Sequence, residues 1–403
     1  MRTVYLDNNA TTAVAPEVLE AMLPFLRERY GNPSSMHAFG GDVGTDVERA
    51  RGELAALLGA ELTSEILFTS CGTESDNTAI LSALEASPDR KQVITTRVEH
   101  PAVLSLVKHL ERKGFEIVRI AVDRDGNLDM VELRAALSTR TAIVSVMWAN
   151  NETGVVFPVE EIARMAHEVG AIFHTDAVQA VGKLPMDMKR SSIDLLSLSG
   201  HKLHAPKGVG ALYIRRGTKF RPMVIGGHQE RNRRGGTENV AGIVALGKAA
   251  ELAGRHLGDE QTRVRALRDK LEQGLLERVP DTIVNGSRER RLPNTTNVSF
   301  EFVEGEAILL LLDRLGVCAS SGSACTSGSL EPSHVLRAMG VPFTFAHGSV
   351  RLSLSRYNTD EDVAHVLREL PPVIARLREI SPFSREHPVP DGPTTCPTTC
   401  GAK

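Results

Sequence analysis

Lys202 lies in an unusual setting, in the stretch SLSGHKLHAPKGVG between an apolar run and a glycine-rich run. A lysine is more often found on a wet surface, with its stem along apolar side chains. Asp176 closes another apolar run, where an aspartate ordinarily caps the next helix. Together, however, the two residues supply both groups that a pyridoxal phosphate site needs: an amine that bonds the cofactor's aldehyde, and a carboxylate that keeps the pyridine nitrogen protonated. We therefore expect Lys202 and Asp176 to hold pyridoxal phosphate.

The phosphate of such a cofactor needs N–H and hydroxyl donors, which the first turn of a helix can supply. Gly72 and Thr73 open an expected helix directly after the apolar run EILFTS. Ser199 and His201 lie beside Lys202 and are further donors. We expect these four residues to surround the phosphate.

Three more polar residues stand at the ends of strands or within one. His100, followed by Pro101, could stack on the pyridine ring and exchange a proton, although a single histidine at a strand end is more often structural. Asn151, in WANNETG, is a neutral donor for the cofactor's phenolic oxygen side or for a substrate carboxylate. Arg351 interrupts an apolar strand, and of its two readings, surface residue or bidentate carboxylate clamp, we favour the clamp.

A second nucleophile is expected at Cys325, in a segment of Ser, Gly, Ala and Thr that is typical of a loop. Of the other cysteines, Cys71 precedes the phosphate turn, Cys318 follows an apolar run, and Cys396 and Cys400 lie near the C-terminus. A CxxxC pair alone is poor evidence for a metal site. No firm metal site is expected, and Cys325 is considered only as a transient ligand of an iron–sulfur cluster.

The segments that must position these residues alternate between short β-rich runs and amphipathic helical patterns, which predicts an α/β fold with a mostly parallel sheet and helices on both faces. In such sheets, ligands bind at the carboxyl ends of the strands. The expected strands are residues 65–70, 92–100, 141–150, 170–178, 193–202 and 210–216. The expected helices between them are residues 75–87, 102–114, 130–138 and 159–170.

A long helical pattern over residues 237–279 leads into a second block of α+β composition. The boundary is expected near residues 255–265. The C-terminal segment is rich in Pro, Thr and Gly and is expected to be disordered. The predicted organisation is a large cofactor-binding domain of residues 15–258, a smaller α+β domain of residues 1–14 and 259–381 that carries the Cys325 loop, and a tail of residues 382–403.

Composition restricts the class of protein. The chain has 403 residues, 41% of them apolar, which is ample for a sizeable core. Its 47 basic and 50 acidic residues give a formal charge of −3, which argues against nucleic acid as a partner. No apolar signal core or membrane-spanning run is present, so the expected partners include no membrane and the expected location is the cytoplasm.

Nine motifs, in order from Val4 to about Pro382, resemble those of the pyridoxal phosphate-dependent cysteine desulfurases: YLDNNATT, GNPSSMHAFG, CGTESDN, VEHPAV, NNETG, HTDAVQ, SGHKLHAPKGVG, GGHQERNRRGGTEN and SSGSACTSG. Within that family the chain is most similar to the nitrogen-fixation (NifS) type. The resemblance implies the type I fold of pyridoxal phosphate-dependent transferases, with a mixed, mostly parallel seven-stranded sheet, and a homodimer.

The resemblance also implies a role for each matching residue. Lys202 would form the covalent bond to the cofactor. Asp176 would contact its ring nitrogen, Gln179 its phenolic oxygen and His100 its ring face. The residues that would bind its phosphate are Gly72, Thr73, Ser199, His201 and Thr237 of the partner subunit. Asn8, Asn151 and Arg351 would bind the substrate carboxylate. The implied activity is conversion of L-cysteine to L-alanine, with the sulfur held as a persulfide on Cys325 and donated through a scaffold protein to iron–sulfur clusters, those of nitrogenase in particular.

Alternatives remain open. A housekeeping desulfurase for iron–sulfur clusters or tRNA thiolation, a selenocysteine lyase and an aminotransferase share this fold, and Cys325 argues against the aminotransferase because transamination needs no thiol. A non-enzymatic sulfur or cluster carrier that uses the tail cysteines is a different class. A visible absorption band from bound cofactor would argue against that carrier.

Overall fold

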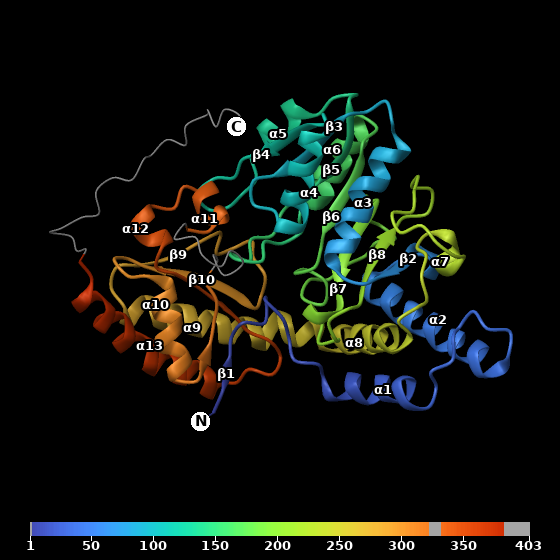
Figure 1. Cartoon of the computed structure of the whole chain (residues 1–403). Coiled ribbons are helices and arrows are strands. Elements are labelled where there is room, and N and C mark those ends of the chain that lie inside the picture. The colour runs from blue at the N-terminus through green and yellow to red at the C-terminus, as the bar shows by residue number, and fades with distance from the viewer. Residues whose placement is uncertain (1, 322–331, 383–403) are drawn as a thin grey trace.

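The largest sheet of the computed structural model has seven strands in the order β2-β8-β7-β6-β5-β3-β4 (Figure 1). The structure describes residues 2–321 and 332–382. Neighbouring strands from β7 through β4 are parallel, whereas β8 is antiparallel to both β7 and β2. The strands are β2 (Ile66–Thr69), β3 (Gln92–Thr96), β4 (Glu116–Ile120), β5 (Thr141–Ser145), β6 (Ile172–Asp176), β7 (Leu195–Ser199) and β8 (Gly210–Ile214). The expected α/β fold with a mixed, mostly parallel seven-stranded sheet is confirmed.

Strand β4 is missing from the strands expected from the sequence. It lies at the edge of the sheet, beside β3 only. Glu116 is exposed and residues 117–119 are half-buried. The strands that were expected are buried along their whole length, except for the half-buried Ile172 that begins β6, and therefore read as nearly continuous apolar runs. Strand β4 buries only Ile120 and carries a weaker signal.

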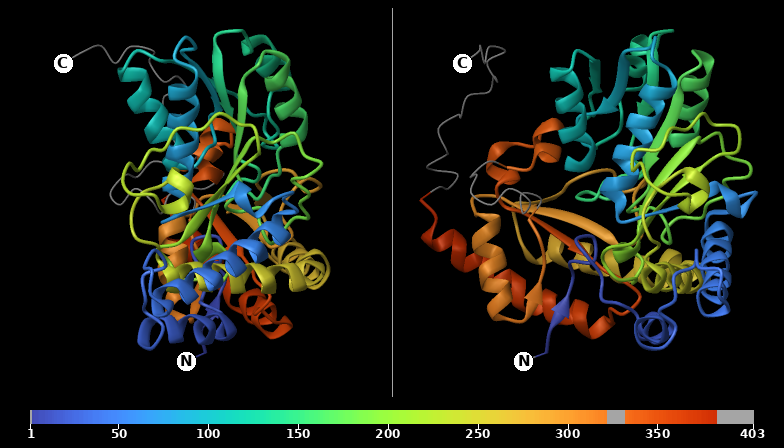
Figure 2. Two further views of the ribbon diagram at one scale, coloured as in Figure 1. Left: turned by 90° about the vertical axis from the view of Figure 1, so that its right-hand side faces the viewer. Right: turned by 45° about the vertical axis from the view of Figure 1, so that its right-hand side comes forward.

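Helices pack around this sheet (Figures 1 and 2). Several begin at residues that favour a helix start, such as Pro101 in the first turn of α4. Both α1 and α2 pack on α8. The helices of this part are α1 (Pro16–Arg27), α2 (Ala38–Leu58), α3 (Gly72–Ala86), α4 (Pro101–Arg112), α5 (Met130–Ala136), α6 (Val159–Glu168), α7 (Gln229–Asn232) and α8 (Val240–Asp259).

A second hydrophobic core forms around a three-stranded antiparallel sheet of order β12-β10-β9. It includes Leu6, Leu271, Phe300, Leu352 and Val366. Near it, β1 pairs in parallel with β11. Its elements are β1 (Val4–Tyr5), α9 (Arg265–Arg278), β9 (Thr282–Val284), β10 (Thr295–Phe300), α10 (Gly305–Arg314), β11 (Val317–Cys318), β12 (Ser349–Ser353) and α13 (Asp360–Ile380).

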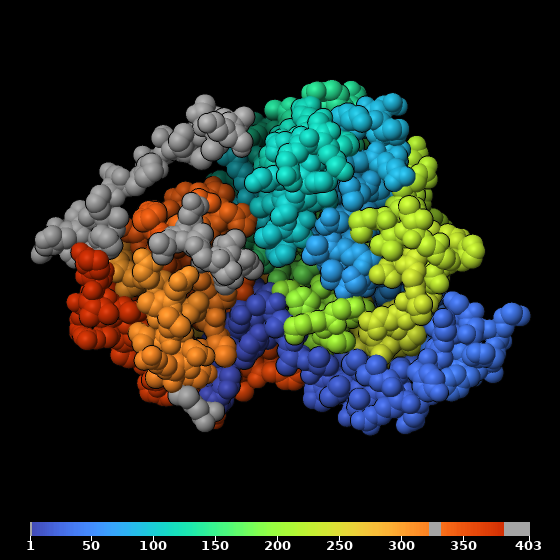
Figure 3. Space-filling model, viewed as in Figure 1, coloured from blue at the N-terminus to red at the C-terminus, as the bar shows by residue number. Residues whose placement is uncertain are grey.

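Two connections join the two cores. A π-helical turn, Glu260–Val264, links α8 directly to α9, in agreement with the long helical pattern expected over residues 237–279. Helices α11 (His334–Ala338) and α12 (Phe343–Ala346) follow β11 in sequence, yet Val335 and Leu336 of α11 pack in the core of the large sheet. Figure 3 shows the dark-blue N-terminal segment between the orange and the green parts of the chain. The N-terminal segment is therefore well placed to contribute to a site between the two cores.

Across residues 2–321 and 332–382, no helix combines the length and the apolar character needed to cross a membrane.

Candidate active site

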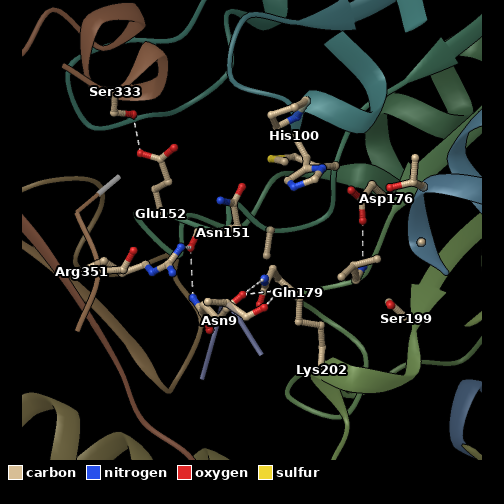
Figure 4. A pocket seen from close by; sticks show the side chains of 18 of the residues that line it. Asn9, His100, Asn151, Glu152, Asp176, Gln179, Ser199, Lys202, Ser333 and Arg351 are labelled. Atoms are coloured by element: carbon tan, nitrogen blue, oxygen red, sulfur yellow. Dashed lines mark hydrogen bonds between the residues drawn. The ribbon is translucent and has the colours of Figure 1, made fainter. Parts of the chain in front are cut away.

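A cavity of about 620 Å³ opens where five strands of the large sheet end. The segments that follow β2, β3, β5, β6 and β7 line one side of it, and the N-terminal segment, α11 and β12 line the other (Figure 4). The carboxyl ends of neighbouring parallel strands meet at one edge of a sheet, which is where α/β proteins bind their ligands. Most of the residues singled out from the sequence lie in this cavity: Gly72, Thr73, His100, Asn151, Asp176, Gln179, Ser199, His201, Lys202 and Arg351.

Asn8 and Thr237 do not line the cavity. The side-chain amide of Asn8 donates to the carbonyl of Ser353, 2.8 Å away, and the next residue, Asn9, lines the cavity instead. Thr237 lines a separate hollow of about 140 Å³ near Ser70. Cys325, Cys396 and Cys400 lie outside the described residues.

Lys202 ends a short 3-10 turn, Gly200–Lys202, that follows β7 directly. Its Nζ donates to the backbone carbonyls of Asn9 and Ala10, with a distance of 2.7 Å to Ala10. Burial, followed by the nearby charge of Arg351, lowers the pKa of Lys202 to about 7. A large fraction of this amine is therefore unprotonated at neutral pH, as a nucleophile requires.

Asp176 ends β6 and is buried in the cavity wall. Its Oδ1 accepts a hydrogen bond from the backbone N–H of Val178 at 2.9 Å. Burial raises the pKa of Asp176 to about 6, and burial together with Asp176 raises the pKa of Asp76 well above its usual range. Two buried carboxyl groups therefore lie near each other, and a protonated ring nitrogen would be a favourable partner for Asp176.

A neutral histidine lies beside these two acids. Both ring nitrogens of His174 make hydrogen bonds, Nδ1 with the Ser145 hydroxyl at 2.8 Å and Nε2 with the Ser197 hydroxyl at 2.9 Å. Burial lowers the pKa of His174 to about 3, so this ring does not neutralise the acids. Within the described chain, Asp76 Oδ1 has no hydrogen-bond partner.

His100 caps the N-terminus of α4, because its Nδ1 accepts from the N–H of Ala102 at 3.2 Å. Burial, followed by the charge of Lys202, lowers the pKa of His100 to about 4. Its imidazole is therefore neutral at neutral pH, carries its proton on Nε2, and could both stack on an aromatic ring and exchange that proton. Figure 4 shows His100 on the same side of the cavity as Asp176.

The N-terminus of α3 forms one end of the cavity. Gly72 is the first residue of this 15-residue helix, and a Cβ there would lie 2.8 Å from Val178 Cγ2 and 3.5 Å from Ser199 Cβ. The absence of a side chain at Gly72 thus lets the helix start approach the segments after β6 and β7 closely. A phosphate fits this arrangement of free helix N–H groups and hydroxyls.

Arg351 occupies the opposite end of the cavity. Its Nη1 donates to the carbonyl of Asn151 at 3.1 Å, and its Nη2 donates to Asp7 Oδ1 at 2.7 Å. In the described part of the chain its Nε has no partner. The guanidinium still has N–H groups to offer to a carboxylate.

Sequence reasoning missed several residues of the cavity. Asp7 and Asn9 lie in the YLDNNATT motif, and Glu152 lies in NNETG, so the motifs marked the segments but not these side chains. Burial raises the pKa of Glu152 to about 7, although a hydrogen bond from the Ser333 hydroxyl acts in the opposite direction. Among the described residues, the carboxamide oxygen of Gln179 lacks a partner. An amine that loses its proton near neutral pH, a buried carboxyl pair, an unpaired amide oxygen and a helix N-terminus in one cavity fit pyridoxal phosphate.

Comparisons with known proteins agree with this chemistry. Residues 4–366 match the model of the aminotransferase class-V family. The chain is 65% identical to a cysteine desulfurase of Gluconacetobacter diazotrophicus over 95% of this chain and 96% of that protein. It is 62% identical to the cysteine desulfurase NifS of Azotobacter vinelandii over 97% of this chain and 98% of that protein.

Solved structures are similar over most of the chain. A NifS-like protein has a TM-score of 0.88 at 40% identity, covering 93% of this chain and all (100%) of that one. A protein described as SspA in complex with cysteine has a TM-score of 0.78 at 35% identity, covering 89% of this chain and 100% of that one. The chain belongs to the aminotransferase class-V family and, within it, to the pyridoxal phosphate-dependent cysteine desulfurases.

Proposed function

We propose that this enzyme converts L-cysteine to L-alanine and holds the released sulfur as a persulfide on Cys325. The observation that carries the proposal is the cavity in which the half-buried Lys202 amine lies between Asp176 and Arg351. Near-full-length identity of 65% to a cysteine desulfurase supports the same activity.

The residues proposed to hold the cofactor surround Lys202. Asp176 would face the ring nitrogen, Gln179 the phenolic oxygen and His100 the ring face. The phosphate would bind at Gly72, Thr73, Ser199, His201 and Thr237 of the partner subunit. When bound, pyridoxal phosphate supplies an electron sink for the pair left on the α-carbon when its proton is removed.

The chain's own groups would then act on the substrate. Arg351 and Asn151 bind the α-carboxylate and so orient the α-carbon. Asn8, which was expected to take part, would not reach it in this conformation, because its amide is bound to Ser353. Lys202, once uncharged, accepts the α-proton, and His100, also neutral, is placed to take or return a proton.

The sulfur-transfer step is assigned to Cys325. Its thiolate forms an S–S bond with the substrate sulfur while the carbon–sulfur bond breaks. The electron pair of that bond stays on the carbon, which takes a proton to yield L-alanine. The persulfide is then passed to an acceptor, which we propose is an iron–sulfur scaffold protein. Cys325 would at most ligate a cluster transiently, and no resident metal is proposed.

Four further features belong to the proposal. The domains would be residues 15–258 and residues 1–14 with 259–381, because the two hydrophobic cores meet near the π-helical turn after α8. A homodimer would bring Thr237 to the second subunit's cavity, since Thr237 does not line the cavity of its own chain. A cytoplasmic location is also proposed: in the part of the chain that the structure describes, Cys71 and Cys318 are free thiols, as is usual in that compartment. Supply of nitrogenase clusters is supported by the 62% identity to NifS.

Substitution of the thiol tests the assignment. We expect Cys325→Ala to keep the visible absorption of the bound cofactor but to release neither sulfide nor alanine from L-cysteine. The matched control is Cys396→Ala with Cys400→Ala, which should keep alanine production. If the Cys325→Ala enzyme makes alanine at the normal rate and the tail variant is inactive, the sulfur-accepting cysteine lies in the tail. Growth of a strain that lacks this gene, with dinitrogen as its sole nitrogen source, tests the nitrogenase role. Unimpaired growth with normal nitrogenase activity would count against that role.

A further inference from the structure

A tight turn of the N-terminal segment, from Asp7 to Ala10, enters the cavity. The N–H of Ala10 donates to the carbonyl of Asp7 at 3.0 Å, and the Tyr5 hydroxyl donates to the same carbonyl at 3.2 Å. The side-chain amide of Asn9 donates to the Thr295 hydroxyl at 2.8 Å. These bonds hold the turn from both sides, so its backbone carbonyls have fixed directions.

Two of those carbonyls converge on one amine. The Nζ of Lys202 donates to the carbonyl of Asn9 and to that of Ala10 (Figure 4). The carbonyl of Asn9 also accepts from Gln179 Nε2 at 2.9 Å. A primary ammonium has three N–H donors and no acceptor. Converging oxygens therefore bind an ammonium better than they bind a hydroxyl or an apolar group.

The same turn also places a carboxylate beside the carboxylate clamp. Asp7 lines the cavity, and its Oδ1 lies 2.7 Å from Arg351 Nη2. The turn therefore offers oxygens for an ammonium directly next to a guanidinium that can bind a carboxylate. An α-amino acid carries both of these charged groups on one carbon, which matches such a pair of subsites.

We propose that the Asp7–Ala10 turn is an ammonium-binding subsite that two amines use in turn. It holds the amine of Lys202, which donates its N–H groups to the carbonyls of Asn9 and Ala10, whenever Lys202 is not bonded to the cofactor. While Lys202 is bonded, it receives the α-ammonium of the incoming amino acid, whose carboxylate lies at Arg351. This inference rests on the proposed function, in which Lys202 bonds pyridoxal phosphate. The subsite selects zwitterionic α-amino acids and keeps their amine next to the group that it must displace.

The experiment uses the holoenzyme after treatment with borohydride, which fixes the bond between Lys202 and the cofactor. Lys202 then cannot return to the turn, and an added amino acid can only bind without reacting. L-alanine and L-lactate are compared by calorimetric titration, because they have the same shape and differ only in ammonium against hydroxyl. We expect L-alanine to bind about tenfold more tightly than L-lactate, since charge-assisted hydrogen bonds are stronger than neutral ones.

The substitution Asp7→Asn keeps the shape of the side chain and removes its charge. We expect the ratio of the two affinities to fall at least about threefold in this variant. Glu361→Gln is the matched control. Glu361 lies on α13 and forms an exposed ion pair with Arg2, so the substitution also removes one carboxylate charge but should keep the wild-type ratio. Equal binding of L-alanine and L-lactate by the wild-type protein, or an unchanged ratio in Asp7→Asn, would overturn the proposal.

The comparison of the two ligands in the wild-type protein decides the question even if Asp7→Asn does not fold. Failure of the proposed function has a different signature. If borohydride leaves no cofactor attached to Lys202, the proposed function is wrong. If the cofactor is attached and L-lactate binds as tightly as L-alanine, only the ammonium subsite is refuted.

Discussion

Lys202 should react as a free amine near neutral pH. Its pKa is lowered from 10.5 to about 7 by burial and by the charge of Arg351. Since a tenfold change in a protonation equilibrium corresponds to about 1.4 kcal/mol, the folded protein disfavours the ammonium by about 5 kcal/mol relative to water. At pH 8, roughly nine-tenths of Lys202 would be uncharged, whereas well under 1% of an ordinary lysine would be.

The rate at which apo-protein combines with pyridoxal phosphate measures this protonation. We expect the rate, followed by absorbance between pH 5.5 and 9.5, to rise with a midpoint of about 7. Arg351→Gln should move the midpoint upward because it removes a neighbouring positive charge. Asp7→Asn should move it downward because it removes a negative charge that favours the ammonium. Lys207→Ala, at an exposed lysine, is the control and should leave the midpoint unchanged.

A midpoint near 10 would refute the reasoning, because it would mean that burial does not penalise the ammonium. A downward movement in Arg351→Gln would refute the assigned role of Arg351. The same protonation affects stability. Between pH 7 and 10.5 the unfolded chain holds a proton on this lysine that the folded apo-protein has lost, so this group makes the folded state more stable as the pH rises.

Three more predictions concern other buried groups. Burial raises the pKa of Glu99 to about 8, so the folded protein holds a proton that the unfolded chain loses above its ordinary pKa, and stability falls as the pH rises toward 8. Glu99→Gln should therefore be more stable than the wild type at pH 8 by about 3 kcal/mol and show little gain at pH 4.5, as measured by urea denaturation; an equal effect at both pH values would contradict this. Asp176→Asn should retain some cofactor by absorbance yet lose most alanine production, whereas near-normal turnover would exclude its role at the ring nitrogen. Arg51 makes a bidentate ion pair with Glu230 at 2.8 and 2.9 Å. Arg51→Met should lower the free energy of unfolding by about 3–5 kcal/mol, because it leaves the Glu230 carboxylate buried and unpaired. A loss below about 1 kcal/mol would show that water or another group replaces the arginine.

Much of the cofactor end of the site could be predicted from sequence because it depends on local order. Asp176 and Ser199 each close an apolar strand, and Gly72 opens the helix after another. Parallel strands bring their carboxyl ends to one edge of the sheet, so residues far apart in sequence but alike in position meet there. Strand β4 was missed because only its last residue, Ile120, is buried, so its sequence carries little local apolar signal.

The substrate end was less predictable. Asn8 and Asn9 are adjacent and chemically identical, yet only Asn9 faces the cavity, because the bond from the Asn8 amide to Ser353 turns that side chain toward β12. The ion pair of Asp7 with Arg351 joins residues 344 positions apart and exists only because the N-terminal segment packs beside β12.

The sequence by itself determined the alternation of strands and helices, the residue types of the cofactor site and the family to which the chain belongs. These follow from periodicity and from motifs, both of which are properties of neighbouring residues. The tertiary structure alone decided which charges face one another and how strongly each is desolvated. The amine of Lys202 and the carboxyl of Glu99 titrate far from their ordinary pKa values because long-range packing removes water around them, and no spacing of residues along the chain specifies that environment.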